Sequence, residues 1–343
     1  MFGNTMNPIQ SLLLALPPET AHNLAMRGLA LAAPIPIPAI PMAGARRSLF
    51  GKTLINPIGL AAGLDKNAEA VIGLAHCGFG FLEVGTVTPL AQPGNPQPRM
   101  FRLPEYQALI NRMGFNNHGM DAMADKLRQL RQRDCMRGAL LGINLGKNKD
   151  TPNEQAAADY VKGMDCLYIY ADYFTINLSS PNTPGLRELQ HGEPLRQLLE
   201  QLKEKQMALA GQSSVVPLML KVAPDLSDEE IDQIAEQVSS SGFDGVIATN
   251  TTLSRDAVNG HRHASESGGL SGAPLAERSV EVVARLRGAL PASSTIIGVG
   301  GISSGSDARA MLAEGADALQ IYTSFVYQGA KIVRNLVEAT RRN

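Results

Sequence analysis

Eight short apolar runs rich in β-forming residues recur between residues 46 and 343, and helical patterns separate most of them. This alternation limits the fold more than any other feature, because neighbouring parallel strands need a long crossover that is usually a helix. Eight such units predict an α/β fold, a closed (β/α)8 barrel of the TIM type. An open doubly wound sheet is the alternative, but it more often has one Gly-rich turn after its first strand. Here Gly and Asn follow nearly every run.

The predicted strands are Pro57–Ala61, Phe79–Thr88, Ala139–Leu145, Phe174–Leu178, Val216–Val222, Gly245–Thr249, Thr295–Val299 and Ala318–Tyr322. The predicted helices are Asp121–Gln132, Asn153–Tyr168, Pro194–Lys205, Ser227–Ser241, Leu275–Leu290, Ser304–Glu314 and Gly329–Arg341. The helix from Ser227 has the signature of a capping box, with Glu230 three residues later.

Residues 1–45 have a different character and carry only Glu19 and Arg27 of the chain's 31 basic and 32 acidic side chains. Apolar residues at helical spacing predict two helices, which Pro17-Pro18 separates. A stiff Pro-rich linker at 34–38 follows. We therefore expect a helical hairpin at 1–33, held off the main body within an N-terminal extension (1–45), and a barrel domain (46–343).

Two functions for this hairpin are open from its residues alone. It could pack on its own domain, or it could lie on a membrane or cover an apolar ligand tunnel. The apolar run at 11–16 is too short to span a bilayer, and no Lys or Arg precedes it as in a signal peptide.

The overall composition excludes several classes of protein. A net charge of −1 without a basic stripe argues against a nucleic-acid partner, and 44% hydrophobic residues argue against disorder. Three cysteines and six histidines show no ligand spacing, so we expect no metal and no disulfide framework.

Polar side chains gather where the predicted strands end, which is where barrels of this type place their active sites. They are mostly amides, hydroxyls and lysines, a set that suits an anionic, planar ligand with several hydrogen-bonding groups better than a metal. Gly300-Gly301 and the stretch 268–272 can expose main-chain N–H groups, and with the helix starts nearby they predict a phosphate site.

Lys66 and Lys221, both at strand ends, leave alternatives open. Either lysine could pair with an anion, lie on the surface, or form a Schiff base in a lyase of the aldolase type. A barrel that binds a phosphate ligand without catalysis is a further alternative. A Ser-His-Asp hydrolase has little support, since no histidine lies near Ser180 in the sequence.

The motifs in chain order resemble those of the dihydroorotate dehydrogenase family over nearly the whole chain. The resemblance rests on residues 56–66 (NPIGLAAGLDK), 111–117 (NRMGFNN), 177–183 (NLSSPNT), 248–252 (ATNTT), 268–275 (GGLSGAPL) and 297–302 (IGVGGI). Ser180, where soluble members carry Cys, and the charge-poor N-terminus make the chain most similar to the membrane-associated, quinone-linked class 2. Other FMN barrel oxidoreductases, or a class 1-like enzyme with a soluble acceptor, are the alternatives.

The resemblance implies FMN-dependent oxidation of (S)-dihydroorotate to orotate in pyrimidine biosynthesis, with one FMN per chain. Ser180 is expected to accept the C5 proton as the catalytic base. Substrate-binding residues are expected to be Lys66, Asn111, Arg112, Met113, Gly114, Phe115, Asn177, Asn182, Asn250 and Thr251. FMN is expected to bind Ala62, Gly63, Leu64, Asp65, Lys66, Thr86, Asn144, Asn177, Lys221, Thr249, Gly272, Gly301, Tyr322 and Thr323.

The resemblance also implies a membrane quinone as co-substrate, entering past the hairpin, with Arg102 as a candidate for its head group. It implies peripheral membrane contact through residues 1–33, on the cytoplasmic face of a bacterial inner membrane. Two positions depart from the family pattern: Ala68 stands where Gly is expected, and Thr323 where Ser is expected.

Overall fold

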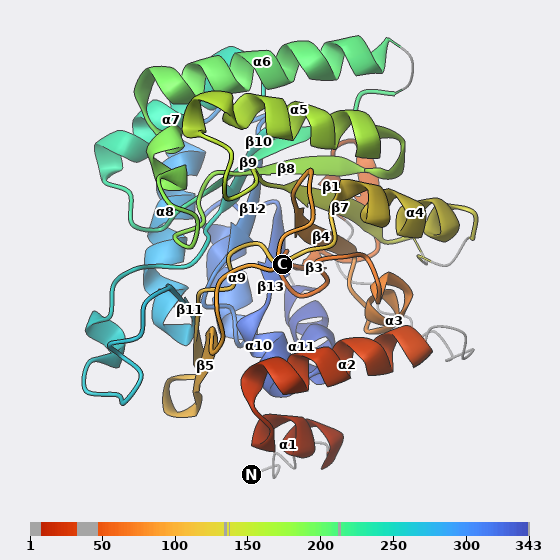
Figure 1. Ribbon diagram of the computed structural model, residues 1–343. Helices are drawn as coiled ribbons and strands as arrows, with labels where there is room; N and C mark the ends of the chain where they lie inside the picture. Colours follow the sequence, from red (N-terminus) through yellow and green to blue (C-terminus); the bar gives the residue numbers. More distant parts are fainter. Residues whose placement is uncertain (1–7, 33–46, 134–135, 137, 212–213, 342–343) are drawn as a thin grey trace.

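A closed barrel of eight parallel strands forms the centre of the computed structural model, which describes residues 8–32, 47–133, 136, 138–211 and 214–341 (Figure 1). The strand order around the barrel is β10-β12-β13-β3-β4-β7-β8-β9. The strands are β3 (Ile58–Leu60), β4 (Phe81–Val87), β7 (Leu140–Leu145), β8 (Tyr173–Asn177), β9 (Leu218–Val222), β10 (Gly245–Ala248), β12 (Thr295–Val299) and β13 (Ala318–Ile321). Each lies within, or one residue from, a predicted run, so the barrel prediction is confirmed and the open sheet is excluded.

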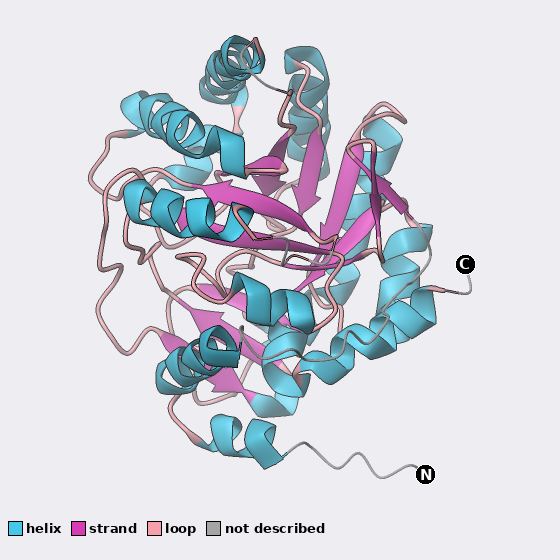
Figure 2. Ribbon diagram, turned by 90° about the vertical axis from the view of Figure 1, so that its right-hand side faces the viewer, coloured by secondary structure: helices cyan, strands magenta, loops and turns pink. Residues whose placement is uncertain are grey.

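Helices surround the barrel, as the side view in Figure 2 shows. They are α3 (Val71–His76), α4 (Met120–Arg131), α5 (Ala156–Leu167), α6 (Gly192–Ala210), α7 (Asp228–Ser241), α8 (Ala276–Ala289), α9 (Gly305–Ala313), α10 (Thr323–Gln328) and α11 (Ala330–Thr340). The predicted capping box is present at α7, where Ser227 and Glu230 bond each other's main-chain N–H groups. The sequence patterns did not predict the short α3 and α10.

Among the described residues, six short 3-10 helices lie in the connections. They are η1 (Pro104–Tyr106), η2 (Asn153–Gln155), η3 (Tyr168–Tyr170), η4 (Leu186–Gln190), η5 (Asp256–Val258) and η6 (Ala273–Leu275).

Apolar side chains close the amino end of the barrel. Phe81, Tyr173, Met219, Ile247 and Ile297 fill its interior there and belong to one buried cluster. A two-stranded hairpin, β1 (Arg47–Leu49) and β2 (Lys52–Leu54), covers this end with further buried leucines and with a phenylalanine ring that packs against the tyrosine. The amino end is therefore a packed plug, and any ligand site has to lie at the other end.

A three-stranded antiparallel sheet stands beside the carboxyl ends of the barrel strands. It consists of β5 (Met100–Leu103), β6 (Ala108–Asn111) and β11 (Gly269–Gly272), in the order β11-β6-β5. The sequence patterns did not predict this sheet, because β5 and β6 lie in the connection after β4 and β11 lies in the connection after β10. It positions residues 111–115 and 269–272 at the barrel mouth.

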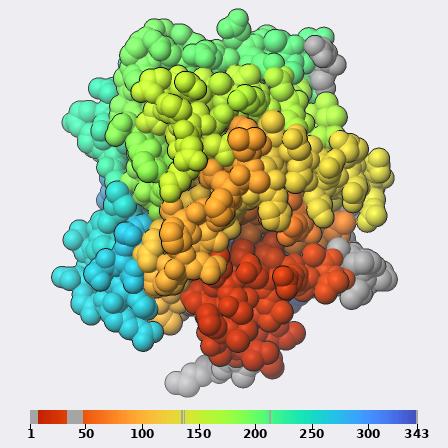
Figure 3. All heavy atoms as spheres, in the orientation of Figure 1, coloured from red at the N-terminus to blue at the C-terminus, as the bar shows by residue number. Residues whose placement is uncertain are grey.

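The N-terminal hairpin consists of α1 (Pro8–Ala15) and α2 (Pro18–Ala32), as the proline pair predicts. The expectation that it is held off the main body is wrong. A Cβ on Gly73 of α3 would lie 2.3 Å from the carbonyl oxygen of Leu29, so α2 packs directly on α3. Glu19 of α2 also pairs with Arg99 at 2.7 Å, and in Figure 3 the hairpin (red) lies against the β5 region (orange). The expected linker at 34–38 lies outside the described residues.

Candidate active site

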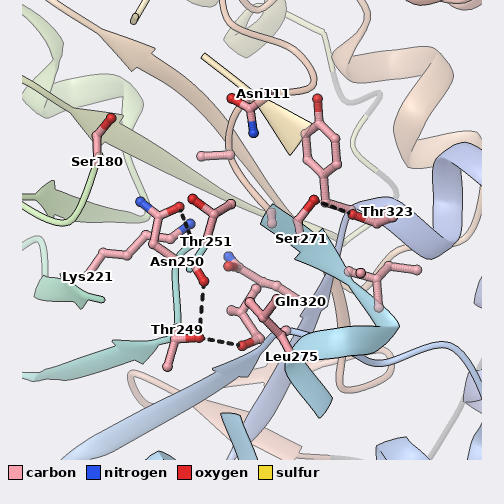
Figure 4. A pocket seen from close by; sticks show the side chains of 18 of the residues that line it. Asn111, Ser180, Lys221, Thr249, Asn250, Thr251, Ser271, Leu275, Gln320 and Thr323 are labelled. Carbon is pink, nitrogen blue, oxygen red and sulfur yellow. Dashed lines mark hydrogen bonds between the residues drawn. The ribbon is translucent and has the colours of Figure 1, made fainter. Parts of the chain in front are cut away.

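A cavity opens at the carboxyl ends of the barrel strands (Figure 4). It has a volume of about 1180 Å³, including its opening to solvent. Its walls combine amides, hydroxyls and two lysines with main-chain atoms of glycines.

Most of the residues predicted from the sequence line this cavity. They are Ala62, Gly63, Lys66, Thr86, Asn111, Met113, Gly114, Phe115, Asn177, Ser180, Asn182, Lys221, Thr249, Asn250, Thr251, Gly272, Gly301, Tyr322 and Thr323. They come from the end of nearly every barrel strand and from the antiparallel sheet, so the fold brings together positions spread over 262 residues of the chain.

Four predicted residues do not line the cavity. Leu64 belongs to the apolar core, and the carboxylate of Asp65 accepts hydrogen bonds from the main-chain N–H groups of residues 69 and 70. Burial raises the pKa of Asp65. Arg112 turns outward to Glu266 at 2.7 Å, and its guanidinium lies over the ring of Phe101. Each of the three has a structural partner that takes it away from the pocket.

Asn144, the fourth, is buried beneath the cavity in a polar network. Its side chain donates to Glu83 Oε1 at 2.8 Å, and its carbonyl oxygen accepts from Thr86 and Asn177. Glu83 Oε2 accepts from Tyr173 at 3.0 Å and from Gln320 Nε2 at 2.8 Å. The network holds the amide groups of Asn177 and Gln320 from below, through the N–H groups that they donate to Asn144 and Glu83.

The sequence motifs did not identify Glu83 and Gln320 as residues of the site. Both are fully buried in barrel strands, and Gln320 lines the cavity. A signal was present, since each interrupts an otherwise apolar strand and a buried polar side chain needs partners. Ser271 and Ser324, which also line the cavity, carried no comparable signal.

The two lysines at the cavity differ in their surroundings. Burial and the nearby Arg99 lower the pKa of Lys66 to about 8, while Glu19 and Asp65 oppose the shift. Burial also lowers the pKa of Lys221, opposed by Glu83. No hydrogen bond or ion pair is found for the Lys221 ammonium within the described part of the chain, so a bound anion or ligand oxygen can approach it.

Ser180 lies on the turn that follows β8, opposite the antiparallel sheet. Its Oγ accepts a hydrogen bond from the N–H of Asn182 at 3.2 Å. The side chain of Asn182 in turn donates to the main-chain oxygen of Asn111 at 3.3 Å. The hydroxyl hydrogen of Ser180 remains available, and the residue lines the cavity.

The far wall, across from Ser180 in Figure 4, has the features of a phosphate cradle. A Cβ on Gly301 would lie 2.2 Å from the Cα of Ala276, and one on Gly272 would lie 2.2 Å from the oxygen of Gln107. Both sites therefore require glycine and present bare main chain. Ser271 Oγ and Thr323 Oγ1 lie 2.8 Å apart beside them. The predicted stretch 268–272 is largely a strand paired with β6, so its part in the cradle comes from its last residues.

Two buried polar atoms on the cavity wall have no hydrogen-bond partner in the described structure, Gln320 Oε1 and Ser324 Oγ. Buried polar groups are normally satisfied, so such atoms are expected to meet a ligand. Together with the unpaired Lys221 they fit a polar ring and its phosphate-bearing chain.

Arg102, expected near a quinone head group, lies on β5 and reaches the hairpin. Its guanidinium donates to the main-chain oxygen of Leu14, in the last turn of α1, at 2.7 Å and to that of Leu16, just after the helix, at 2.9 Å. It therefore holds the carboxyl end of α1 against the sheet.

Ala68, which stands where the family pattern has Gly, has φ of +56°, a left-handed conformation that favours glycine.

Within the described residues, no cluster of three or more His, Cys, Asp or Glu side chains is arranged to hold a metal ion. None of the described helices combines the length and the apolar character needed to cross a bilayer.

The comparisons with known proteins agree with one another. Residues 45–342 match the family model described as dihydroorotate dehydrogenase. A protein of Marinobacter nauticus named dihydroorotate dehydrogenase (quinone) is 51% identical over 97% of this chain and 98% of its own length. One of Stenotrophomonas maltophilia with the same name is 52% identical over 96% of this chain and 94% of its own length.

Solved structures show the same similarity. The crystal structure of DHODH from Eimeria tenella in complex with ferulenol superimposes with a TM-score of 0.87 at 39% identity, covering 94% of this chain and 90% of that chain. The ligand-free form from the same organism gives a TM-score of 0.86.

Proposed function

The chain belongs to the dihydroorotate dehydrogenase family, and from that premise we propose how its cavity oxidises dihydroorotate to orotate, with FMN as the resident cofactor and a quinone as the electron acceptor. The oxidation is a step of pyrimidine biosynthesis. The roles of individual residues, the identity of the cofactor and contact with a membrane are the parts proposed here.

The cavity residues fit FMN. Gly272, Gly301 and the Ser271–Thr323 pair supply main-chain and hydroxyl donors for a phosphate. Lys221 and Gln320 supply a cation and an unpartnered acceptor for a polar ring. When bound, FMN supplies the acceptor for the hydride of dihydroorotate and carries the electrons on to the quinone.

The substrate is held by an amide-rich wall on the Ser180 side of the cavity. Asn111, Asn177, Asn182 and Asn250 offer both N–H donors and carbonyl acceptors, which match the alternating groups of a pyrimidine ring. Lys66, from the loop after β3, is the partner for the carboxylate of dihydroorotate. With a pKa of about 8 its ammonium is mostly charged at neutral pH.

Ser180 accepts the proton from C5 of dihydroorotate. Its Oγ receives the N–H of Asn182, and this donation stabilises negative charge on the oxygen as the hydroxyl proton leaves toward water. Ser180 is itself buried, and the low dielectric constant around it strengthens that contact.

The observation that carries this function is the convergence of four amides, two lysines and the Ser180 hydroxyl on one cavity of a family barrel. The test is optical. The purified protein should be yellow, release FMN on denaturation, and lose its flavin absorbance when dihydroorotate is added without oxygen. A colourless protein, or a flavin that dihydroorotate does not reduce, would contradict the proposal.

The hairpin is proposed to meet the cytoplasmic face of a bacterial inner membrane and to admit the quinone. Ile9, Leu12, Leu24 and Leu31 are exposed on α1 and α2, an unusual density of large apolar side chains for a water-facing surface. Arg102 and the buried face of α2 lie between this surface and the barrel.

Membrane contact can be tested without removing the hairpin. The double variant Leu12→Ser, Leu24→Ser should sediment less with vesicles of phosphatidylglycerol and phosphatidylethanolamine, by roughly tenfold or more, because each buried leucine contributes about 1.5–3 kcal/mol. Met207→Ser, which removes an equally exposed apolar side chain from α6, is the matched control. Equal sedimentation of both variants and the parent protein would refute the assignment.

A further inference from the structure

Two arginines tie loops together at opposite ends of the barrel with the same kinds of partner. Arg187 of η4 donates from Nε to the oxygen of Ser179 (3.0 Å), from Nη2 to the oxygen of Thr251 (2.8 Å) and from Nη1 to Asp225 (2.7 Å). Both carbonyls and the carboxylate belong to loops at the carboxyl end. The guanidinium thus joins the loops after β8, β9 and β10.

Arg287 of α8 has an equivalent set of contacts at the amino end. It donates from Nε to the oxygen of Gly315 (3.0 Å), from Nη1 to that of Ser294 (3.1 Å) and from Nη2 to Asp317 (2.8 Å). The two side chains are also similarly exposed, 20% for Arg187 and 25% for Arg287. They therefore differ chiefly in what they hold.

The carbonyls bound by Arg187 flank the two sides of the substrate wall. Ser179 directly precedes Ser180, and Thr251 directly follows Asn250. A second contact joins the same loops, from Asn250 Nδ2 to Ser179 Oγ at 3.0 Å. Asp225 orients the guanidinium and also accepts from the Thr252 hydroxyl and from the N–H of Leu253, so it fixes the loop after β10 as well.

On the basis of the proposed function, we propose that Arg187 is a positioning residue for proton abstraction. It sets the distance between the proposed base Ser180 and the segment Asn250–Thr251, which holds the substrate ring. A guanidinium is suited to this because its planar fork binds several oxygens at fixed angles, which a lysine cannot do. A displacement of about 1 Å between a base and its substrate can cost ~10²-fold in rate.

The experiment compares Arg187→Gln with Arg287→Gln in the FMN-loaded, full-length enzyme. Stopped-flow absorbance measures two steps separately: reduction of the flavin by saturating dihydroorotate, and its reoxidation by a short-chain quinone. Arg187→Gln should slow the first step by ~10²-fold and change the second less than about twofold. Arg287→Gln should change neither step, although both variants lose a comparable part of their thermal stability.

Dihydroorotate deuterated at C5 allows the kinetic isotope effect on flavin reduction to be measured, a quantity that general destabilisation of the protein does not change. The isotope effect on flavin reduction should rise in Arg187→Gln, because proton abstraction becomes more fully rate-limiting. If Arg187→Gln does not accumulate as holoenzyme, Arg187→Lys is measured instead; it keeps the charge but loses the fork and should show a smaller loss in the same step.

Three outcomes overturn the inference. They are equal reduction rates in the two glutamine variants, a parallel loss in both half-reactions of Arg187→Gln, or an unchanged isotope effect. Failure of the wild-type enzyme to oxidise dihydroorotate would instead refute the proposed function, so the two failures are distinguishable.

Discussion

The two ends of the barrel are built from the same strands but are filled by opposite kinds of side chain. At the amino end Phe81, Met219 and Ile297 pack into an apolar plug under the β1–β2 hairpin. At the carboxyl end the same strands present amides, hydroxyls and lysines to an open cavity. The difference teaches that one end carries stability and the other carries chemistry, with the Glu83 network as the boundary between them.

The largest effect is expected at the carboxyl end. Ser180→Ala should slow anaerobic flavin reduction by dihydroorotate by ~10²–10⁴-fold, because it removes the proposed base. The melting temperature and the FMN content should stay unchanged, since the hydroxyl makes only one described hydrogen bond. Flavin reduction at the parental rate would show that Ser180 is not the base. It would also contradict the division between a stabilising amino end and a catalytic carboxyl end.

The converse change at the amino end should cost stability alone. Met219→Ala leaves a cavity in the plug and should lower the free energy of unfolding by about 2–5 kcal/mol. The rate of flavin reduction per bound FMN should match the parent protein. Denaturant unfolding and stopped-flow absorbance check the two parts, and a slower reduction step would show that the ends are coupled.

A smaller effect is expected from pH. In the proposed site the protonated Lys66 binds the orotate carboxylate, and the pKa of Lys66 in the free enzyme is about 8. The dissociation constant of orotate should therefore be nearly constant below that value. Between pH 8 and 9 it should rise by up to about tenfold per unit, because the lysine must first regain a proton.

Titration of orotate into the enzyme at each pH measures this dependence. Lys66→Arg, which stays charged over the whole range, should abolish the rise whatever its effect on affinity. A rise of the same size in Lys66→Arg would assign the titration to another group, such as Lys221.

The smallest effect concerns a departure from the family pattern. Ala68 adopts φ of +56°, so Ala68→Gly should relieve strain and stabilise the protein by about 1 kcal/mol. A shift in the urea midpoint at constant slope measures it. Ala61→Gly is the control. Ala61 is a buried alanine just after β3 and its φ is not positive, so the change should destabilise the protein instead.

Sequence periodicity predicted the barrel because its strands are largely apolar runs and the predicted helices have an apolar face. Those patterns are local, and α7 with its capping box illustrates them. The antiparallel sheet was not predicted because β5 and β6 are only four residues long, and β11 pairs with a segment about 160 residues away, from Ser271 to Leu109. Pairing at that separation leaves no periodic signal.

The site was predictable to a similar extent. Asn, Lys and Gly at strand ends could be read from the motifs, and the fold gathers most of them in one cavity. Arg112 and Asp65 share those motifs but turn to Glu266 and to main-chain N–H groups, since a motif specifies residue type and not the direction of a side chain. Arg187, which belongs to no predicted set, takes its partners from three loops.

By itself the sequence determined the eight-fold alternation, the hairpin's two helices and the residue types at the barrel mouth, because hydrophobic periodicity, proline and glycine act over a few neighbouring residues. Only the tertiary structure decided that the hairpin packs on α3 and β5, that Glu83 supports the cavity from below, and which of the two matched arginines faces the substrate wall. These outcomes depend on contacts between distant segments, whose geometry exists only once the barrel has closed.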